Sequence, residues 1–317
     1  MHWIVERLRA TAQKNPKKIL FPEPKDDRVR EAVAFIEKEG IARPLIVDAS
    51  IMDKARQEEF AAGYFERHQK RCAGLDEARK LMEDPLYYTA MMTRSGLADG
   101  FVAGAIYSTS SVARAAIRCL EVDTRIGVAS GCFTMAVPGS NYGEKGVLIF
   151  SDCAVVPQPS AEQLAAIGVA AAEFTRDILM IPPQVAFLSF STHGSAKNRL
   201  VEKVREAVEL FKKAVPDIPV DGELQADSAL DAGVAKRKLP ASPVAGKANV
   251  LVFPDLEAGN ISYKLAQRLA KARALGPILL GLKQCCSDLS RGCSVDDIVD
   301  CAALTAIRAH HLGSKAT

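Results

Sequence analysis

The stretch KILFPEPKDDRVREAVAFIEKEGIARPLIV, residues 18–47, has the pattern of a strand, a helix and a second strand. Its first apolar run, 19–21, ends at Pro22. Asp26 or Asp27 can then cap a helix whose apolar residues recur every three or four positions. A second apolar run closes the stretch. Two strands joined by a crossover helix are typical of a parallel sheet, so the predicted fold class is α/β.

Strands and helices keep alternating along the rest of the chain, which supports the same class. Two helix starts have the spacing of a capping box, Ser160 with Gln163 and Ser294 with Asp297. We expect further strands at 99–105, 126–137, 146–156, 185–191, 250–253 and 278–280. We expect helical segments at 51–82, 86–95, 111–120, 160–178, 261–274 and 295–310.

A chain of 317 residues is long enough for two domains. The C-terminal helix is expected to return to the first domain, because the two ends of a domain's chain often lie close together. We therefore expect residues 1–137 and 285–317 to form a discontinuous first α/β domain. Residues 138–284 are then a second α/β domain inserted into it.

Composition argues against several classes of protein. The net charge of +3 is small and the basic residues are dispersed, which does not fit a nucleic-acid-binding protein. No apolar run reaches the ~20 residues that a membrane helix needs, and charged residues follow Met1 too closely for a signal peptide. We expect a cytoplasmic protein with eight reduced, buried cysteines. No metal site is predicted, because no Cys-x-x-Cys spacing with matching histidines is present.

The stretch SDLSRGCSVDDIV, residues 287–299, is the strongest candidate for a functional site. It places Ser290 and Arg291 just before a helix whose predicted N-cap is Ser294. A helix N-terminus offers free N–H groups and the positive end of the helix dipole, and arginine adds a fixed positive charge. This combination predicts an anion site. Taken singly, Ser290 is more typical of a turn and Arg291 is more typical of a solvated surface. For Asp297 the alternative role is that of a helix cap.

Thr109 and Ser110 form a second candidate. They lie between a predicted strand and a predicted helix, at the edge where α/β sheets bind ligands. They either contact a phosphate or simply cap the helix. His193 also follows a predicted strand, but no partner acid is recognisable nearby, so we expect an ordinary loop histidine.

Several segments together resemble the phosphotransacetylase (phosphate acetyltransferase) family. In chain order they are DPLYYTAMM, DGFVAGAIYSTSSVARAAI, SDCAVVPQPSAEQLAAI, VAFLSFSTHGSAK, VDGELQADSAL, VFPDLEAGNISYKLAQR and DLSRGCSVDDIV. The resemblance implies a fold like that of isocitrate and isopropylmalate dehydrogenases: two α/β domains with a cleft between them, assembled as a homodimer. It also implies the reversible conversion of acetyl-CoA and phosphate into acetyl phosphate and CoA. CoA is then a substrate, and no cofactor or metal is implied.

By motif, Ser290, Arg291 and Asp297 match the family's catalytic serine, arginine and aspartate, and Arg79 matches another active-site arginine. The implied mechanism is direct transfer. Asp297 accepts the proton of the CoA thiol, the thiolate attacks the acetyl carbonyl, and Ser290 and Arg291 stabilise the developing charge. Reference pKa values of an aspartate and a thiol differ by about 4.6 units, so this proton transfer costs about 6 kcal/mol unless the site shifts one of them.

Two positions depart from the family pattern. Val128 stands where a further arginine is expected, and Arg125 is the nearest substitute. Residues 283–287 read KQCCS where the family usually has Lys-Pro-Val-Asn, and the missing proline relaxes the loop. The expected substrate-binding residues are Arg79, Thr109, Ser110 and Arg125.

Three alternatives remain open at this point. A butyryltransferase differs from an acetyltransferase in its acyl pocket, whose volume the sequence does not give. A dehydrogenase of the related fold is less favoured, because no Gly-x-Gly-x-x-Gly follows the first strand. A catalytically silent relative would act as a regulatory or binding module.

Overall fold

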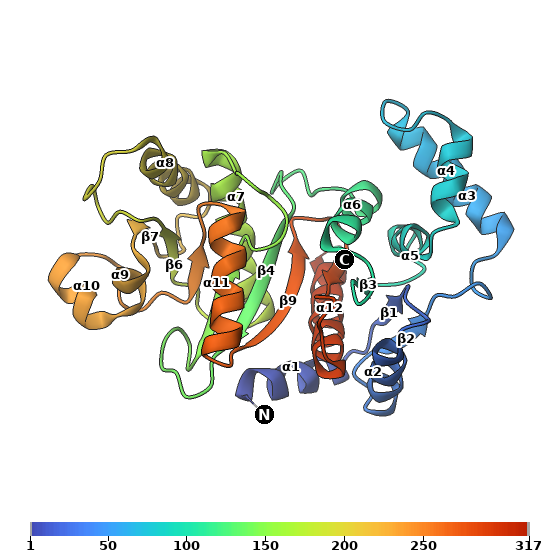
Figure 1. Cartoon of the computed structure of the whole chain (residues 1–317), viewed down its shortest axis with the longest axis horizontal. Coiled ribbons are helices and arrows are strands. Elements are labelled where there is room, and N and C mark those ends of the chain that lie inside the picture. Colours follow the sequence, from blue (N-terminus) through green and yellow to red (C-terminus); the bar gives the residue numbers. More distant parts are fainter. Residues whose placement is uncertain (1, 316–317) are drawn as a thin grey trace. The chain divides into compact units, whose positions relative to one another are not determined.

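The computed structural model describes residues 2–315, which divide into two compact units (Figure 1). Residues 5–121 and 282–315 form the discontinuous unit, and residues 2–4 with 122–281 form the inserted unit. The sequence prediction places residues 122–137 in the first domain. In the structure they belong to the inserted unit, because strand β4 (Ser130–Ala136) pairs with strands of that unit on both of its edges.

The discontinuous unit contains a parallel four-stranded sheet in the order β2-β1-β3-β10. Its strands are β1 (Lys18–Phe21), β2 (Arg43–Ile46), β3 (Gly100–Ala103) and β10 (Cys285–Asp288). The predicted parallel unit at 18–47 is confirmed, with α2 (Asp27–Lys38) as the crossover helix. The other helices are α1 (Trp3–Gln13, mostly in this unit), α3 (Lys54–His68), α4 (Leu75–Met82), α5 (Pro85–Arg94), α6 (Thr109–Leu120) and α12 (Val295–Lys315).

Helices α2 and α12 lie side by side against one face of this sheet (Figure 1). Ile19 and Phe21 point into their shared core, together with Ile36 and Ile298. Leu20, between them on β1, points to the opposite face and is also fully buried. A strand buried on both faces reads as a continuous apolar run, which is why the sequence pattern identified it.

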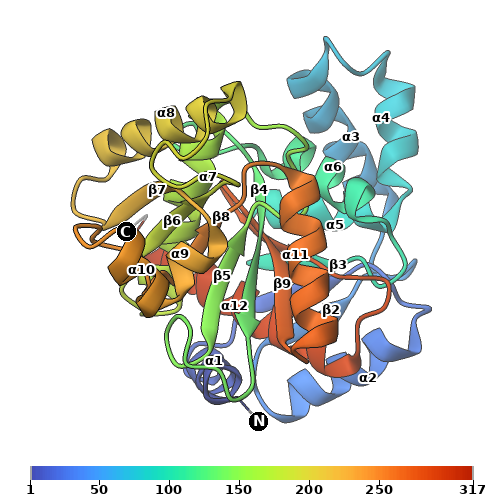
Figure 2. The same cartoon turned by 60° about the vertical axis from the view of Figure 1, so that its left-hand side comes forward.

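Helices α3 and α4 form a hairpin that stands away from the sheet (Figures 1 and 2). Asp53 caps α3, and its side chain accepts the N–H of Arg56. The segment predicted to be helical, 51–82, contains the two helices α3 and α4. None of the helices within residues 2–315 is long and apolar enough to cross a membrane.

The inserted unit contains a mixed sheet in the order β9-β4-β5-β8-β6-β7. Strand β4 is antiparallel to β5 (Val147–Ser151) and β9 (Arg273–Leu280). The other strands, β6 (Val185–Leu188), β7 (Val220–Leu224) and β8 (Val250–Val252), run parallel to one another and to β5. The helices are α7 (Ala161–Glu173), continued by a π-helical turn at Phe174–Ile178, α8 (Arg199–Ala214), α9 (Ala226–Leu230), α10 (Ala232–Lys238) and α11 (Leu256–Leu269).

Helix α11 packs against this sheet, on β4, β5 and β9 (Figure 2). Tyr263 stacks on Phe133 of β4, with 4.1 Å between the ring centroids. The helix predicted at 261–274 is α11, which begins earlier, at Leu256, and ends earlier, at Leu269. Arg273 is already in β9. Gly276-Pro277 lies inside β9. The register shift on β4 between Cys132 and Thr134 accommodates this proline, which has no N–H to donate.

Candidate active site

The predicted anion site is a tight turn between β10 and α12. The N–H of Cys293 donates to the carbonyl oxygen of Ser290 at 2.8 Å, and the N–H of Gly292 donates to the Ser290 hydroxyl oxygen at 3.3 Å. Ser290 and Arg291 are both exposed, whereas Leu289 just before them is buried in the core. The buried leucine anchors the turn and leaves the two polar side chains at the surface.

The predicted capping box at the start of α12 is confirmed. The Ser294 N–H donates to Asp297 Oδ2 at 2.9 Å, and the Asp297 N–H donates to the Ser294 hydroxyl oxygen at 3.2 Å. This reciprocal pair satisfies two N–H groups that the helix itself leaves open. Asp297 therefore has a structural role, whatever chemistry it performs.

Arg28, which the sequence analysis did not identify, braces the same turn. Its Nη1 group donates to the carbonyl oxygens of Arg291 and Cys293, both at 2.9 Å. Its Nη2 group donates to Asp26 at 2.7 Å and to the carbonyl of Ala105 at 3.0 Å. Hydrogen bonding to Asp26 raises the pKa of Arg28. One planar guanidinium thus ties the Ser290 turn to the loop after β3.

Glu23 holds that loop from the other side and was also missed. Its carboxylate is 3% exposed and accepts four consecutive backbone N–H groups, from Gly104 to Tyr107, at distances from 2.7 to 3.2 Å. Hydrogen bonds to an ionised carboxylate are stronger than those between two neutral groups. The local signal, an acid between two prolines, does not show that its partners lie about eighty residues away.

Thr109 and Ser110 open helix α6, but neither is its N-cap. Ser108 is the N-cap, and its hydroxyl oxygen accepts the N–H of Ser111. The Ser110 hydroxyl bonds to that of Ser108 at 2.9 Å. Thr109 lies close enough to Asp288 for its hydroxyl to lower the pKa of that carboxyl. The structure therefore brings Thr109 beside the strand that leads into the Ser290 turn.

Comparison with known proteins identifies the family. Residues 3–306 match the model of the phosphate acetyl/butaryl transferase family. The phosphate acetyltransferase of Thermoanaerobacterium thermosaccharolyticum is 44% identical over 325 residues, covering 96% of this chain and 99% of that protein. The chain belongs to this family. The structure of a phosphotransacetylase from Streptococcus pyogenes has 39% identity and a TM-score of 0.89, with 97% and 98% of the two chains covered.

A dehydrogenase provides a more distant comparison of fold alone. A putative 4-hydroxythreonine-4-phosphate dehydrogenase from Salmonella typhimurium has 12% identity and a TM-score of 0.50, covering 94% of this chain and 99% of that one. The predicted α/β fold related to dehydrogenases is confirmed.

The two arginines that the family resemblance assigned to substrate are paired with carboxylates in this transferase. Arg79, on α4, bonds to Glu58 at 2.9 and 3.1 Å and to Asp76 at 2.8 Å. Arg125 belongs to the inserted unit and makes a bidentate pair with Glu173 at 2.7 and 2.8 Å. Both side chains are about half exposed, 44% and 59%, so an incoming phosphate can compete for them.

The cysteines of this transferase are buried, as predicted. Burial raises the pKa of Cys153 well above its ordinary value. Burial also raises the pKa of Cys293, inside the turn, to about 11, although Arg28 opposes this. A thiol with a raised pKa is a poor nucleophile, so these cysteines are packing residues.

His193 does have a partner acid, contrary to the expectation from sequence. Its Nε2 lies 2.9 Å from Asp221 Oδ1, and the Ser242 hydroxyl donates to the other carboxylate oxygen. The three residues come from separate loops and strand β7, which is why the sequence spacing did not show the pair. The carboxylate lies between the serine and the histidine, so this is not the order that activates a serine nucleophile.

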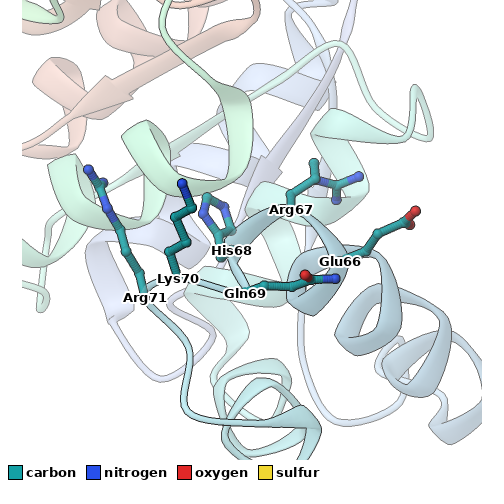
Figure 3. A pocket seen from close by; sticks show the side chains of 6 residues that line it. All are labelled: Glu66, Arg67, His68, Gln69, Lys70 and Arg71. Carbon is teal, nitrogen blue, oxygen red and sulfur yellow. The ribbon is translucent and has the colours of Figure 1, made fainter.

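A basic pocket of about 380 Å³ lies at the C-terminal end of α3 (Figure 3). Its lining residues are Glu66, Arg67, His68, Gln69, Lys70 and Arg71. Burial and the nearby charge of Arg94 lower the pKa of Arg67. Basic residues at a helix C-terminus complement the helix dipole, so these charges have a structural reason. None of the site residues predicted from sequence lines this pocket.

Proposed function

We propose that this transferase is a phosphate acetyltransferase that moves an acetyl group between acetyl phosphate and the thiol of CoA. One observation carries the proposal: a family member presents an exposed serine and arginine at the N-terminus of α12, on a turn braced by Arg28. That position favours a phosphate group, because the helix dipole and the guanidinium act together. CoA is a substrate in this reaction, and no further cofactor is required.

In the proposed mechanism the thiol proton passes to Asp297. Its Oδ2 accepts the Ser294 N–H, so Oδ1 is the proposed proton acceptor. The thiolate sulfur attacks the acetyl carbon, the bond from that carbon to the phosphate oxygen breaks, and phosphate leaves with the electron pair. Asp297 then returns the proton to solvent or to phosphate. The Arg291 guanidinium and the Ser290 hydroxyl donate to the developing oxyanion and the departing phosphate.

Arg79, Arg125, Thr109 and Ser110 are proposed substrate-binding residues. Arg79 and Arg125 must exchange a carboxylate partner for a phosphate group of the substrates, and their exposure favours this exchange. A location in the cytoplasm is part of the same proposal.

The acyl group is tested by comparing acetyl phosphate with butyryl phosphate. With CoA present, we expect thioester to form from both. We expect the specificity constant for acetyl phosphate to be higher by about thirtyfold or more, since each of the two extra methylenes costs about 1 kcal/mol or more in a site built for acetyl. The measurement is the rise in thioester absorbance. A preference for butyryl phosphate would make the protein a butyryltransferase, and no thioester from either substrate would favour a silent relative.

A homodimer is also proposed, with α11 in the contact surface. Ile261, Leu265 and Leu269 follow one another at four-residue intervals on α11 and are 57%, 52% and 80% exposed. Single exposed apolar residues are ordinary, but a stripe along one helix face is typical of an interface between copies.

We expect Leu265→Asp to convert a dimer into a monomer, because a buried unpaired charge is costly at an apolar interface. The control is Leu200→Asp on α8, which is similarly exposed at 50%. Sedimentation equilibrium gives the mass of each variant. An unchanged dimer in Leu265→Asp, or a monomeric wild type, would contradict the proposal.

A further inference from the structure

Two buried carboxyl groups lie behind the Ser290 turn, and their surroundings differ. Glu23 accepts four backbone N–H groups, as described above. Asp288, the last residue of β10, is completely buried. Neither of its carboxyl oxygens has a hydrogen-bond partner within the part of the chain that the structure describes. A buried carboxyl group without donors is costly to ionise, so it calls for a functional explanation.

The backbone packs tightly around Asp288 and fixes its direction. At Gly104, with φ of +116°, a Cβ atom would lie 2.4 Å from Asp288 Oδ1 and 2.7 Å from both the N and the O of Leu289. Only glycine fits there, because of this close approach and the positive φ. The carboxyl group is thus held between the loop after β3, the start of α6 and the backbone that leads into Ser290.

Burial and the nearby carboxylate of Glu23 favour the protonated form of Asp288. Burial raises the pKa of Asp288 to about 7, and the charge of Glu23 adds to this effect. The Thr109 hydroxyl and the Leu289 N–H lie close enough to lower the pKa, although neither reaches hydrogen-bond geometry.

No cation among residues 2–315 lowers the pKa of Asp288. On β10 itself, Cys286 is a buried thiol whose pKa is raised. From α12, Arg308 donates to the carbonyl of Cys286 at 3.4 Å, and from α2, Arg28 is engaged by Asp26. Strand β3, which pairs with β10, contains only glycine and apolar residues between Gly100 and Ala103. From the loop after β3, Tyr107 donates its hydroxyl hydrogen to Asp84.

Building on the proposed function, we propose that Asp288 is a positioning residue that must hold a proton when a phosphate group occupies the Ser290 turn and the start of α6. Phosphate binding is thereby tied to the uptake of one proton. In the proposed phosphate complex, protonated Asp288 donates its hydroxyl hydrogen to the Thr109 oxygen, and the Thr109 hydrogen is then free to point toward the anion. Ionised Asp288 accepts that hydrogen instead and places a second negative charge behind the site.

The sign of the pH dependence follows from this arrangement. A bound dianion disfavours ionisation of Asp288, so its pKa is higher in the complex than in the free protein. Below the free-protein pKa, Asp288 is already protonated and affinity does not depend on this group. Above that pKa, a proton must be taken up on binding, and affinity falls by up to about tenfold per pH unit.

Sulfate is the probe, because it resembles phosphate and its charge does not change across the neutral range. Titration calorimetry of the full chain, in two buffers of different ionisation enthalpy, gives both the affinity and the number of protons taken up. We expect the wild type to approach uptake of one proton above the pKa of Asp288. Asp288→Asn, whose amide resembles the protonated acid, should bind sulfate with a nearly flat pH profile. The control Asp296→Asn removes an exposed carboxylate, 58% accessible, and should keep the wild-type slope.

Thr109→Val provides a second test, which holds even if Asp288→Asn does not fold. It removes the hydroxyl through which Asp288 is proposed to act, so we expect weaker sulfate binding below the pKa of Asp288 and a shallower slope above it. A wild-type slope in Asp288→Asn or in Thr109→Val would overturn the inference, as would a wild type that binds no sulfate. Thioester formation in these variants keeps the two proposals apart: an active enzyme with an unchanged slope contradicts only the role of Asp288.

Discussion

Arg291→Gln is expected to lower kcat/KM for thioester formation by about 10²–10³-fold, the usual effect of removing one preorganised donor from a site of developing charge. Glutamine keeps a hydrogen-bond donor but loses the positive charge and the two-pronged geometry that suits a phosphate group. The fold should be unaffected, because the brace from Arg28 contacts the backbone carbonyl of residue 291 and not its side chain.

Two comparisons sharpen the expectation for Arg291. Arg176→Gln is a matched control, because Arg176 is an exposed arginine of the inserted unit that pairs with its neighbour Asp177. It should keep wild-type rates. Arg291→Lys restores the charge without the fork and should recover only part of the loss. If Arg291→Gln retained more than about a tenth of the wild-type kcat/KM, Arg291 would not be the main stabilising donor.

Glu23→Ala is expected to lower the free energy of unfolding by about 3–5 kcal/mol, the cost of breaking a buried charged network from one side. The substitution leaves the N–H groups of Gly104, Ala105, Ile106 and Tyr107 without their acceptor. Urea denaturation followed by circular dichroism gives the free energy. Glu37→Ala, an exposed glutamate on α2, is the control and should change it by less than about 0.5 kcal/mol.

Glu23→Gln separates shape from charge in the same experiment. The amide fills the same space, but its NH₂ group must face an N–H donor of the loop, because both carboxylate oxygens accept in the native structure. We expect an intermediate loss of stability. An effect of Glu23→Ala no larger than that of the exposed control would show that water replaces the carboxylate and that the loop does not depend on it.

Local features of the candidate site could be predicted from sequence because their partners lie a few residues apart. The capping box of Ser294 and Asp297 is such a feature. In the fold, the strand–helix–strand unit at 18–47 could be predicted because its hydrophobic periodicity is local to each element. Strand β10 was missed, since Cys-Cys-Ser-Asp has neither alternating polarity nor β-branched residues. It is a strand because β3 offers it a parallel edge, with Asp288 opposite Ala103.

By itself, the sequence determined the α/β class, the capped helix after Ser290 and Arg291, and the resemblance that pointed to the family. Hydrophobic period and cap spacing are local properties, so the chain states them directly. Only the tertiary structure decided that Arg28 braces the turn, that Glu23 fills the loop after β3, and that Asp288 is buried without a donor. The reason is that the free energy of burying a charged group depends on the backbone groups that surround it, and those groups come from segments far apart in the chain.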